Sequence, residues 1–113
     1  MTEWEIAVQA AQEKQADDIV VLDIGQVSTF TDTFVVCSGG NTRQNQAISD
    51  AIQATLKQEG VRVLGIEGFQ NAEWILMDYG DFVVHVLSTE ARKFYDLEWL
   101  WKNAPRIPIP EAA

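Results

Sequence analysis

The sequence predicts an α/β fold in which one mixed sheet of five strands carries helices. Three observations support this fold class. Runs of β-branched residues bounded by glycine or charge recur along the chain and predict strands. Three other stretches have apolar residues at helical spacing. One of these helical stretches lies between two predicted strands, which indicates at least one parallel crossover.

The chain is long enough for one domain only. Its 113 residues can enclose a single core, and 47% hydrophobic and 22% charged residues are an ordinary globular composition. We therefore expect one domain over residues 1–104. A tail over residues 105–113 follows, and it contains the three prolines of the chain.

The first third of the chain predicts a helix and two strands. Residues 3–16 have the apolar spacing of a helix. Residues 18–24 and 33–39 are short β-branched runs without alternation, which is typical of strands with both faces covered. The second run ends at Gly39-Gly40, a strong signal for a turn.

A second helix is predicted over residues 42–59. Asn41 is a suitable N-cap, and Gln44 stands three residues later, as in a capping box. The apolar residues between them and Gly60 form one stripe, and Gly60 provides the C-terminal stop. We expect this helix to pack on the sheet.

The second half of the chain predicts three strands and a last helix. Residues 61–69 indicate a strand that glycines weaken or bulge. Residues 73–88 indicate two strands around a tight turn at Tyr79-Gly80. Residues 89–101 indicate a helix with Thr89 as its cap. Prolines exclude helix and inner strand from the tail, so we expect it to be extended or frayed.

Composition also limits the location and the partners of the protein. No apolar run approaches the roughly 20 residues that cross a bilayer, and the first residues resemble no targeting segment. The single cysteine, Cys37, cannot form an internal disulfide, which favours the cytoplasm. A net charge of -9 opposes broad binding to nucleic acid and suits a basic protein partner, although solubility alone also explains it.

The hairpin predicted over residues 73–88 has two unlike faces. A loop at Tyr79-Gly80 would pair Trp74 with His85, and a loop shifted by one position would leave the faces unchanged. The apolar face, which we expect to lie in the core, carries Ile75, Met77, Tyr79, Phe82, Val84 and Val86. The other face, called the mixed face below, carries Trp74, Leu76, Asp78, Asp81, Val83, His85 and Leu87.

The mixed face is unusual for either a core or a solvent surface. Burying two unpaired aspartates would cost several kcal/mol per ion. An ordinary solvent face would not carry four large apolar side chains. An open face that binds a partner needs both kinds of residue. In the alternative interpretation, helix 89–101 covers this face and His85 bonds a carboxylate there.

Enzymatic interpretations have less support in the sequence. A metal site needs three or four ligands, and no ligand spacing is recognisable, so we expect no metal and no cofactor. A nucleophilic pair of Cys37 and His85 is conceivable, but Cys37 lies in an apolar strand, where cysteine is usually inert.

A nucleotide-binding enzyme is the main alternative function. Ser38-Gly39-Gly40 connects a strand to a helix N-terminus, which is the geometry that holds phosphate. A nucleotidyltransferase would also need two or three carboxylates on neighbouring strands, and the next strand offers only Glu67. The turn also has a purely structural explanation, because a sharp strand-to-helix turn needs glycine.

Residues 67–101, EGFQNAEWILMDYGDFVVHVLSTEARKFYDLEWLW, resemble the signature of the Iojap family, the bacterial ribosomal silencing factors. Upstream segments agree, namely DIVVLDI, TDTFVVCSG and the RQ that opens the second helix. The resemblance covers roughly residues 5–106. Its most specific part is GDFVVHV followed by R-x-F-Y-D-L-E-x-L-W.

The resemblance implies a fold similar to the nucleotidyltransferase core without its catalytic acids. It implies binding to the large ribosomal subunit through that subunit's fourteenth protein, a basic component of the face that meets the small subunit. Occupying this face would block subunit joining and lower translation when nutrients are scarce. The same resemblance implies homodimers.

The resemblance also implies which residues contact the partner. They are Trp74, Leu76, Asp78, His85, Leu87, Arg92, Tyr95 and Leu97, with Asp81 and Trp101 as further candidates. Trp74 and Leu87 would supply apolar area, Asp78 and Asp81 would meet lysine or arginine, and His85 would be an oriented polar contact. Arg92 could equally brace an acidic side chain within the fold.

The leading hypothesis is therefore a ribosome-binding translation repressor without enzymatic activity. It predicts that Trp74→Ala or Leu87→Ala weakens partner binding by roughly 1–4 kcal/mol while the fold survives. The rivals are the nucleotide-binding enzyme and a dimeric scaffold that buries the mixed face against its own copy.

Overall fold

A computed structural model describes residues 1–110 of the chain. The helices are α1 (Glu3–Glu13), α2 (Thr42–Gln58), α3 (Thr89–Tyr95) and α4 (Leu97–Leu100). The strands are β1 (Asp17–Asp23), β2 (Thr33–Gly39), β3 (Gly65–Glu67), β4 (Trp74–Asp78), β5 (Phe82–Ser88) and β6 (Arg106–Ile107).

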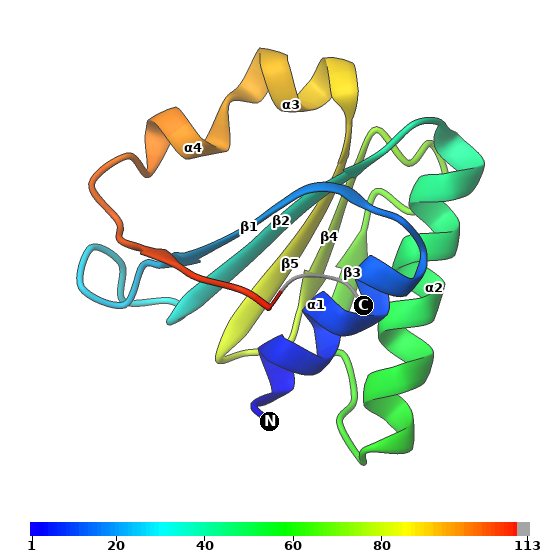
Figure 1. The fold of residues 1–113 in the computed structure, drawn as a ribbon, viewed down its shortest axis with the longest axis horizontal. Coiled ribbons are helices and arrows are strands. Elements are labelled where there is room, and N and C mark those ends of the chain that lie inside the picture. The colour runs from blue at the N-terminus through cyan, green and yellow to red at the C-terminus, as the bar shows by residue number, and fades with distance from the viewer. Residues whose placement is uncertain (111–113) are drawn as a thin grey trace.

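The elements form three layers around one mixed sheet (Figure 1). The strand order is β3-β4-β5-β2-β1-β6, with β2 and β5 parallel at the centre. Helices α1 and α2 pack on one face of the sheet, while α3 and α4 lie over the other. The expected α/β class and the parallel pair are therefore confirmed.

The sheet has six strands instead of the expected five. The sixth, β6, comes from the proline-rich tail and pairs antiparallel with β1, with Ile107 opposite Val21. Prolines on both sides of this short strand limit it to the sheet edge, because proline has no N–H to donate. The tail is extended as far as Pro110, whose carbonyl accepts a hydrogen bond from Gln12 Nε2 at 2.7 Å. Tail residues 111–113 lie outside the described residues.

Helix α2 follows its predicted boundaries closely. Its apolar stripe is fully buried against the sheet through Ile48, Ile52 and Leu56. The Asn41 side chain caps it by accepting from the Gln44 N–H at 2.8 Å. Gln44 Oε1 accepts from the Gly40 N–H instead of the Asn41 N–H, so the two residues do not form the reciprocal capping box.

Several other predicted boundaries are wrong. Helix α1 ends at Glu13 instead of residue 16, and the strand predicted over 61–69 shrinks to β3. Ser88, not Thr89, caps α3, through a hydrogen bond from the Ala91 N–H to Ser88 Oγ at 3.0 Å. The last helix is broken because Asp96 adopts a left-handed conformation with φ of 48°.

The hairpin loop is Gly80-Asp81, one position later than expected. Trp74 therefore lies opposite Leu87, and Leu76 lies opposite His85. The positive φ of 87° at Gly80 suits the first loop position of such a turn. Because the loop moved by one whole position, each side chain keeps its predicted face.

Candidate partner-binding surface

The apolar face of the hairpin is buried, as predicted. All six of its side chains belong to the core under α1 and α2. Cys37 lies on this side as well, whereas His85 lies on the other. Full burial raises the pKa of the Cys37 thiol to about 12, so the thiol stays protonated at neutral pH. Cys37 and His85 therefore cannot form a nucleophilic pair.

The mixed face is half covered and half open. Its β5 residues Val83, His85 and Leu87 are buried, because α3 turns back over β5 and β2 directly after Ser88. Its β4 residues Trp74 and Leu76 stay partly exposed. Asp78 is also partly exposed and Asp81 is exposed. The expectation of a fully open mixed face is thus wrong for β5.

His85 is a buried neighbour of Trp74. The Trp74 Nε1–H donates to His85 Nδ1 at 3.0 Å, and the His85 side chain is 4% exposed. The alternative prediction of a covered face is correct for His85, but its partner is an indole and not a carboxylate. Burial lowers the His85 pKa to about 4, so the ring is neutral at pH 7 with its proton on Nε2.

The His85–Trp74 hydrogen bond belongs to a longer row of ring contacts. Phe94 contacts Tyr95, Tyr95 contacts Trp74, and Trp74 contacts His85, with centroid distances of 5.0, 4.7 and 5.9 Å. On its other side, His85 meets Phe34 edge-on at 4.5 Å. The open end of the row is its α3 end, because Phe94 is 81% and Tyr95 46% exposed.

The open half of the mixed face and the exposed α3 end of this row of rings together form the candidate docking surface, called the docking surface below. Its apolar residues are Trp74, Leu76, Phe94 and Tyr95. Sequence reasoning missed Phe94, although its place beside Tyr95 in the specific motif was a usable signal. A cavity of about 500 Å³ adjoins the surface where Phe94 and Tyr95 lie near Glu73.

Carboxylates border the docking surface. Glu67 on β3 lies directly opposite Leu76 and therefore shares its face. Asp78 follows on β4, and exposed Asp81 lies in the hairpin loop. Glu73 immediately precedes Trp74 and is also exposed. The result is an apolar patch with an acidic rim.

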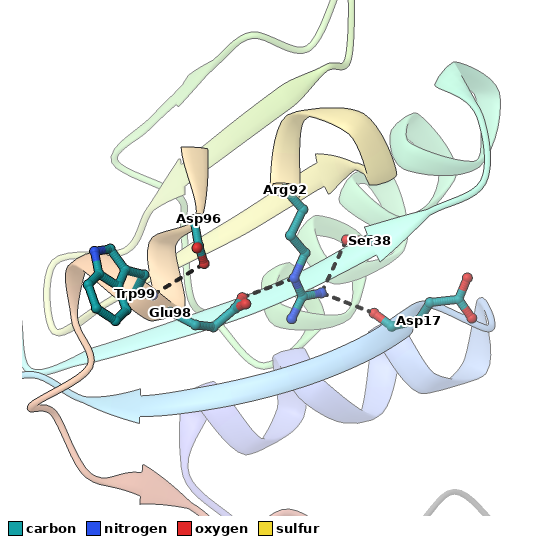
Figure 2. A network of polar contacts seen from close by, with 6 residues as sticks. All are labelled: Asp17, Ser38, Arg92, Asp96, Glu98 and Trp99. Carbon is teal, nitrogen blue, oxygen red and sulfur yellow. Dashed lines mark hydrogen bonds and ion pairs between the residues drawn. The ribbon is translucent and has the colours of Figure 1, made fainter. Parts of the chain in front are cut away.

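The remaining predicted contact residues belong to α3, α4 and the residue after α4, and they face the sheet or point away from the docking surface. Leu97 is buried against the sheet, and the partly exposed Trp101 packs edge-on against Phe34 at 5.4 Å. Arg92 points away from the docking surface, toward Ser38 and Glu98 (Figure 2). The structure therefore brings only Trp74, Leu76 and Tyr95, with Asp78 and Asp81 beside them, to one open surface.

The Ser38-Gly39-Gly40 turn is occupied by its own neighbours. Ser38 Oγ accepts from Arg92 Nη1 at 3.1 Å, and the Gly40 N–H donates to Gln44 Oε1 at 2.7 Å. A Cβ at Gly39 would overlap Asn45 Oδ1, which explains the need for glycine there. Within residues 1–110, no three His, Cys, Asp or Glu side chains gather as a metal site would require.

The comparison with protein families identifies the chain. The family described as "Ribosomal silencing factor during starvation" matches residues 2–113. The chain belongs to this ribosomal silencing factor family. Its membership confirms the resemblance that the motif after Glu67 indicated.

The bacterial relatives of this chain match it over most of their length. The ribosomal silencing factor of Bacillus subtilis is 42% identical over 100 residues, which cover 88% of this chain and 85% of the relative. That of Halalkalibacterium halodurans is 35% identical over 105 residues, which cover 93% of this chain and 90% of the relative. The chloroplastic protein Iojap of Zea mays is 32% identical and matches over 44% of its own length.

A solved structure agrees with the fold of this silencing factor. A crystal structure of a protein from Chromobacterium violaceum superposes with a TM-score of 0.85 at 34% identity, covering 100% of this chain and 93% of that one. The likeness to the nucleotidyltransferase core stays a prediction.

Family membership gives the silencing factor a ribosome-associated role in lowering translation. The family is one of silencing factors and not of known enzymes, and the comparisons give no support to the nucleotide-binding alternative. None of the helices in residues 1–110 is long and apolar enough to span a membrane.

Proposed function

We propose that the protein represses translation by binding the fourteenth protein of the large ribosomal subunit through the docking surface. Occupying that site would block the small subunit sterically and lower translation under nutrient limitation. The observation that carries the proposal is the open apolar patch of Trp74, Leu76, Phe94 and Tyr95 inside an acidic rim. The work would take place in the cytoplasm, as the lone Cys37 suggests.

The chemistry of the docking surface matches a basic protein. Aromatic side chains supply much of the binding free energy at the centre of an interface, where water is excluded. The surrounding carboxylates attract lysine and arginine and orient the approach of the partner. The same carboxylates and the net charge of -9 repel the ribosomal RNA around the target.

We divide the predicted contact residues by task, according to their exposure and their neighbours. We assign direct contact to Trp74, Leu76 and Tyr95, and charge pairing to Asp78 and Asp81. His85 orients the Trp74 indole through their hydrogen bond, which leaves the apolar ring of Trp74 for the partner. The buried Leu87 and Leu97, together with Trp101, support α3 and α4 from below.

Co-sedimentation with isolated large subunits tests the proposal. Trp74→Ala should leave the protein at the top of a sucrose gradient, because truncating an aromatic anchor costs roughly 2–4 kcal/mol of binding free energy. Trp99→Ala is a matched control, because Trp99 is 62% exposed on α4 and its ring makes no aromatic contact with the docking surface in the described residues. Equal co-sedimentation of both variants would refute the proposed site.

The steric mechanism needs a separate measurement. Mixing purified large and small subunits with the protein should lower the yield of joined ribosomes, and Trp74→Ala should restore that yield. A protein that binds large subunits but leaves joining unchanged would contradict the steric mechanism.

A second copy of the chain is the competing occupant of the docking surface. Homodimers would bury the same apolar patch, so light scattering at increasing protein concentration should compare the natural chain with Trp74→Ala. A dimer that Trp74→Ala abolishes, combined with unchanged large-subunit binding, would favour the dimeric scaffold over the ribosomal site.

A further inference from the structure

Arg92 lies on the side of α3 opposite the docking surface. Its guanidinium reaches the start of β1 and the end of β2, whereas Trp74 belongs to β4 on the other side of β5. Tyr95, one turn further along α3, contacts Trp74 with ring centroids 4.7 Å apart. Helix α3 therefore connects the Arg92 contacts on one side to the docking surface on the other.

The Arg92 side chain joins three parts of the fold (Figure 2). Its Nε donates to Glu98 Oε1 on α4 at 3.0 Å. Its Nη1 donates to Ser38 Oγ at 3.1 Å and to the Asp17 carbonyl at 3.5 Å. The pair with Glu98 is the only ion pair found in residues 1–110, and both side chains are largely shielded, at 12% and 24% exposed.

The helices that Arg92 connects are short and bury few of their residues. Helix α3 has seven residues and α4 has four, which is too short for either to be stable alone. Each buries a single residue, Ala91 in α3 and Leu97 in α4. Asp96 separates them in a left-handed conformation and caps α4 by accepting from the Trp99 N–H at 3.3 Å. The angle between the helices therefore depends on side-chain contacts across this break.

We propose that Arg92 is a positioning residue for partner binding and does not touch the partner. By holding α3 to the sheet and to α4, it keeps the Tyr95 ring against Trp74 and so completes the docking surface. The inference rests on the proposed function, because it concerns the same surface. Of the two roles that the sequence left open for Arg92, partner contact and a brace within the fold, it favours the brace.

Arginine is required for this task because of its shape. The planar guanidinium directs its N–H groups along separate fixed lines, so Nε and Nη1 serve different partners at once. Lysine would offer one flexible ammonium group, which cannot reach Glu98 and Ser38 with the same geometry. Arg92→Lys therefore keeps the charge and loses the brace.

Four variants test the inference by their affinity for large subunits. Arg92→Lys and Glu98→Ala should each weaken binding about tenfold, within the range of indirect coupling effects. Glu98→Gln keeps an acceptor oxygen for Arg92 Nε and should retain most of the affinity. Ile52→Val lowers stability from the far face of the sheet, where Ile52 is fully buried, and should leave binding unchanged.

An NMR signal reports the position of Tyr95 without the ribosome. The Trp74 indole N–H lies in the hydrogen bond to His85 beside the Tyr95 ring, so its resonance depends on where that ring sits. Trp74→Phe identifies the signal among those of the four tryptophans. Arg92→Lys and Glu98→Ala should shift it, while Glu98→Gln and Ile52→Val should not.

The outcomes separate this inference from the proposed function. An unshifted Trp74 signal in Arg92→Lys overturns the positioning role, and it does so even if binding falls, since Arg92 would then contact the partner itself. Unchanged affinity alongside a shifted signal also overturns it. If Trp74→Ala binds normally, the proposed function fails. In a Trp74→Ala background, Arg92→Lys should weaken binding no further, because both changes remove the same contact.

Discussion

At the scale of single residues, the Trp74–His85 hydrogen bond fixes both the charge of the imidazole and the place of the indole on the mixed face. The bond requires an unprotonated Nδ1, so the imidazole must be neutral for the indole to keep its place. His85 is therefore unsuited to meet a partner as a cation. Its contribution is to hold Trp74, the largest side chain of the docking surface.

The His85 pKa predicts how stability depends on pH. The folded pKa of about 4 lies below the ordinary value of 6.5, so the unfolded chain binds the proton first as the pH falls. The free energy of unfolding should decrease between about pH 6.5 and pH 4, by about 3 kcal/mol in total from this group. Urea unfolding across that range measures the decrease.

His85→Gln provides the control for this pH dependence. Glutamine can still accept a hydrogen bond from Trp74, but it does not titrate. The difference between the two stability curves should therefore be constant above pH 6.5, and the natural chain should lose stability relative to His85→Gln toward pH 4. Parallel curves over the whole range would mean that His85 does not titrate as its burial indicates.

Leu87 and Trp74 should respond differently to truncation. Leu87 is fully buried between the sheet and α3, so Leu87→Ala should lower the free energy of unfolding by about 2–5 kcal/mol. This corrects the sequence-based expectation that Leu87 lies on an open face and contacts the partner. Trp74→Ala should lower stability less and binding more. Chemical denaturation of both variants, together with the large-subunit assay, tests this difference between a core residue and a contact residue. Equal losses of stability in the two variants would contradict it.

At the scale of elements, the alternation of side chains along the hairpin predicted its two faces correctly, whereas the turn signal placed the loop one position too early. The period of two assigned residues 74–78 and 82–87 to the correct faces, although the loop lies one position later at Gly80-Asp81. The glycine and the flanking aspartates allowed both loop positions. Only the packing of the whole hairpin distinguishes between the two loop positions, and a local sequence pattern contains no information about that packing.

The break at Asp96 could not be predicted from helical spacing. Residues 89–101 have apolar side chains at positions that suit a continuous helix, and aspartate is tolerated within helices. The segment is also held by contacts that are distant in sequence, such as that of Arg92 with Ser38, and helical spacing contains no information about them. The sequence left the cover over His85 open between two interpretations for the same reason, since it depends on where α3 lies in space.

Substitutions at Asp96 test the break as an element. Asp96→Asn should be nearly neutral, because asparagine also tolerates the left-handed conformation and can cap α4. Asp96→Ala should lower the free energy of unfolding by about 1–3 kcal/mol through loss of the cap and backbone strain. Thermal unfolding of the two variants measures this; equal melting temperatures would contradict the role of the cap.

At the scale of the whole molecule, the net charge and the topology of the fold together determine which surface is suited to a partner. The net charge of -9 surrounds the open apolar patch of Trp74, Leu76, Phe94 and Tyr95, while α1 and α2 cover the core on the other face of the sheet. Composition alone indicated a basic partner, with solubility as an equally good explanation of the charge. The location of the patch needed the fold, because Phe94 and Leu76 are far apart in sequence.

Salt should weaken binding to the large subunit mainly by slowing association. Raising the salt from about 0.05 M to about 0.5 M shortens the range of electrostatic attraction several-fold. The association rate should therefore fall, while the dissociation rate, governed by Trp74 and its neighbours, changes little. Asp78→Asn with Asp81→Asn should reduce this salt dependence. A dissociation rate that rises steeply with salt would instead indicate that charge pairs dominate the bound state.

The edge strand β6 has a consequence for the order of synthesis. Arg106 and Ile107 complete the sheet beside β1, yet they leave the translating ribosome after every other strand. Until then the outer row of β1 amide and carbonyl groups stays unpaired, and α3 and α4 have only just emerged. During synthesis, this edge of the sheet is therefore the last to close, after β4 with its Trp74 and Leu76 has already left the ribosome.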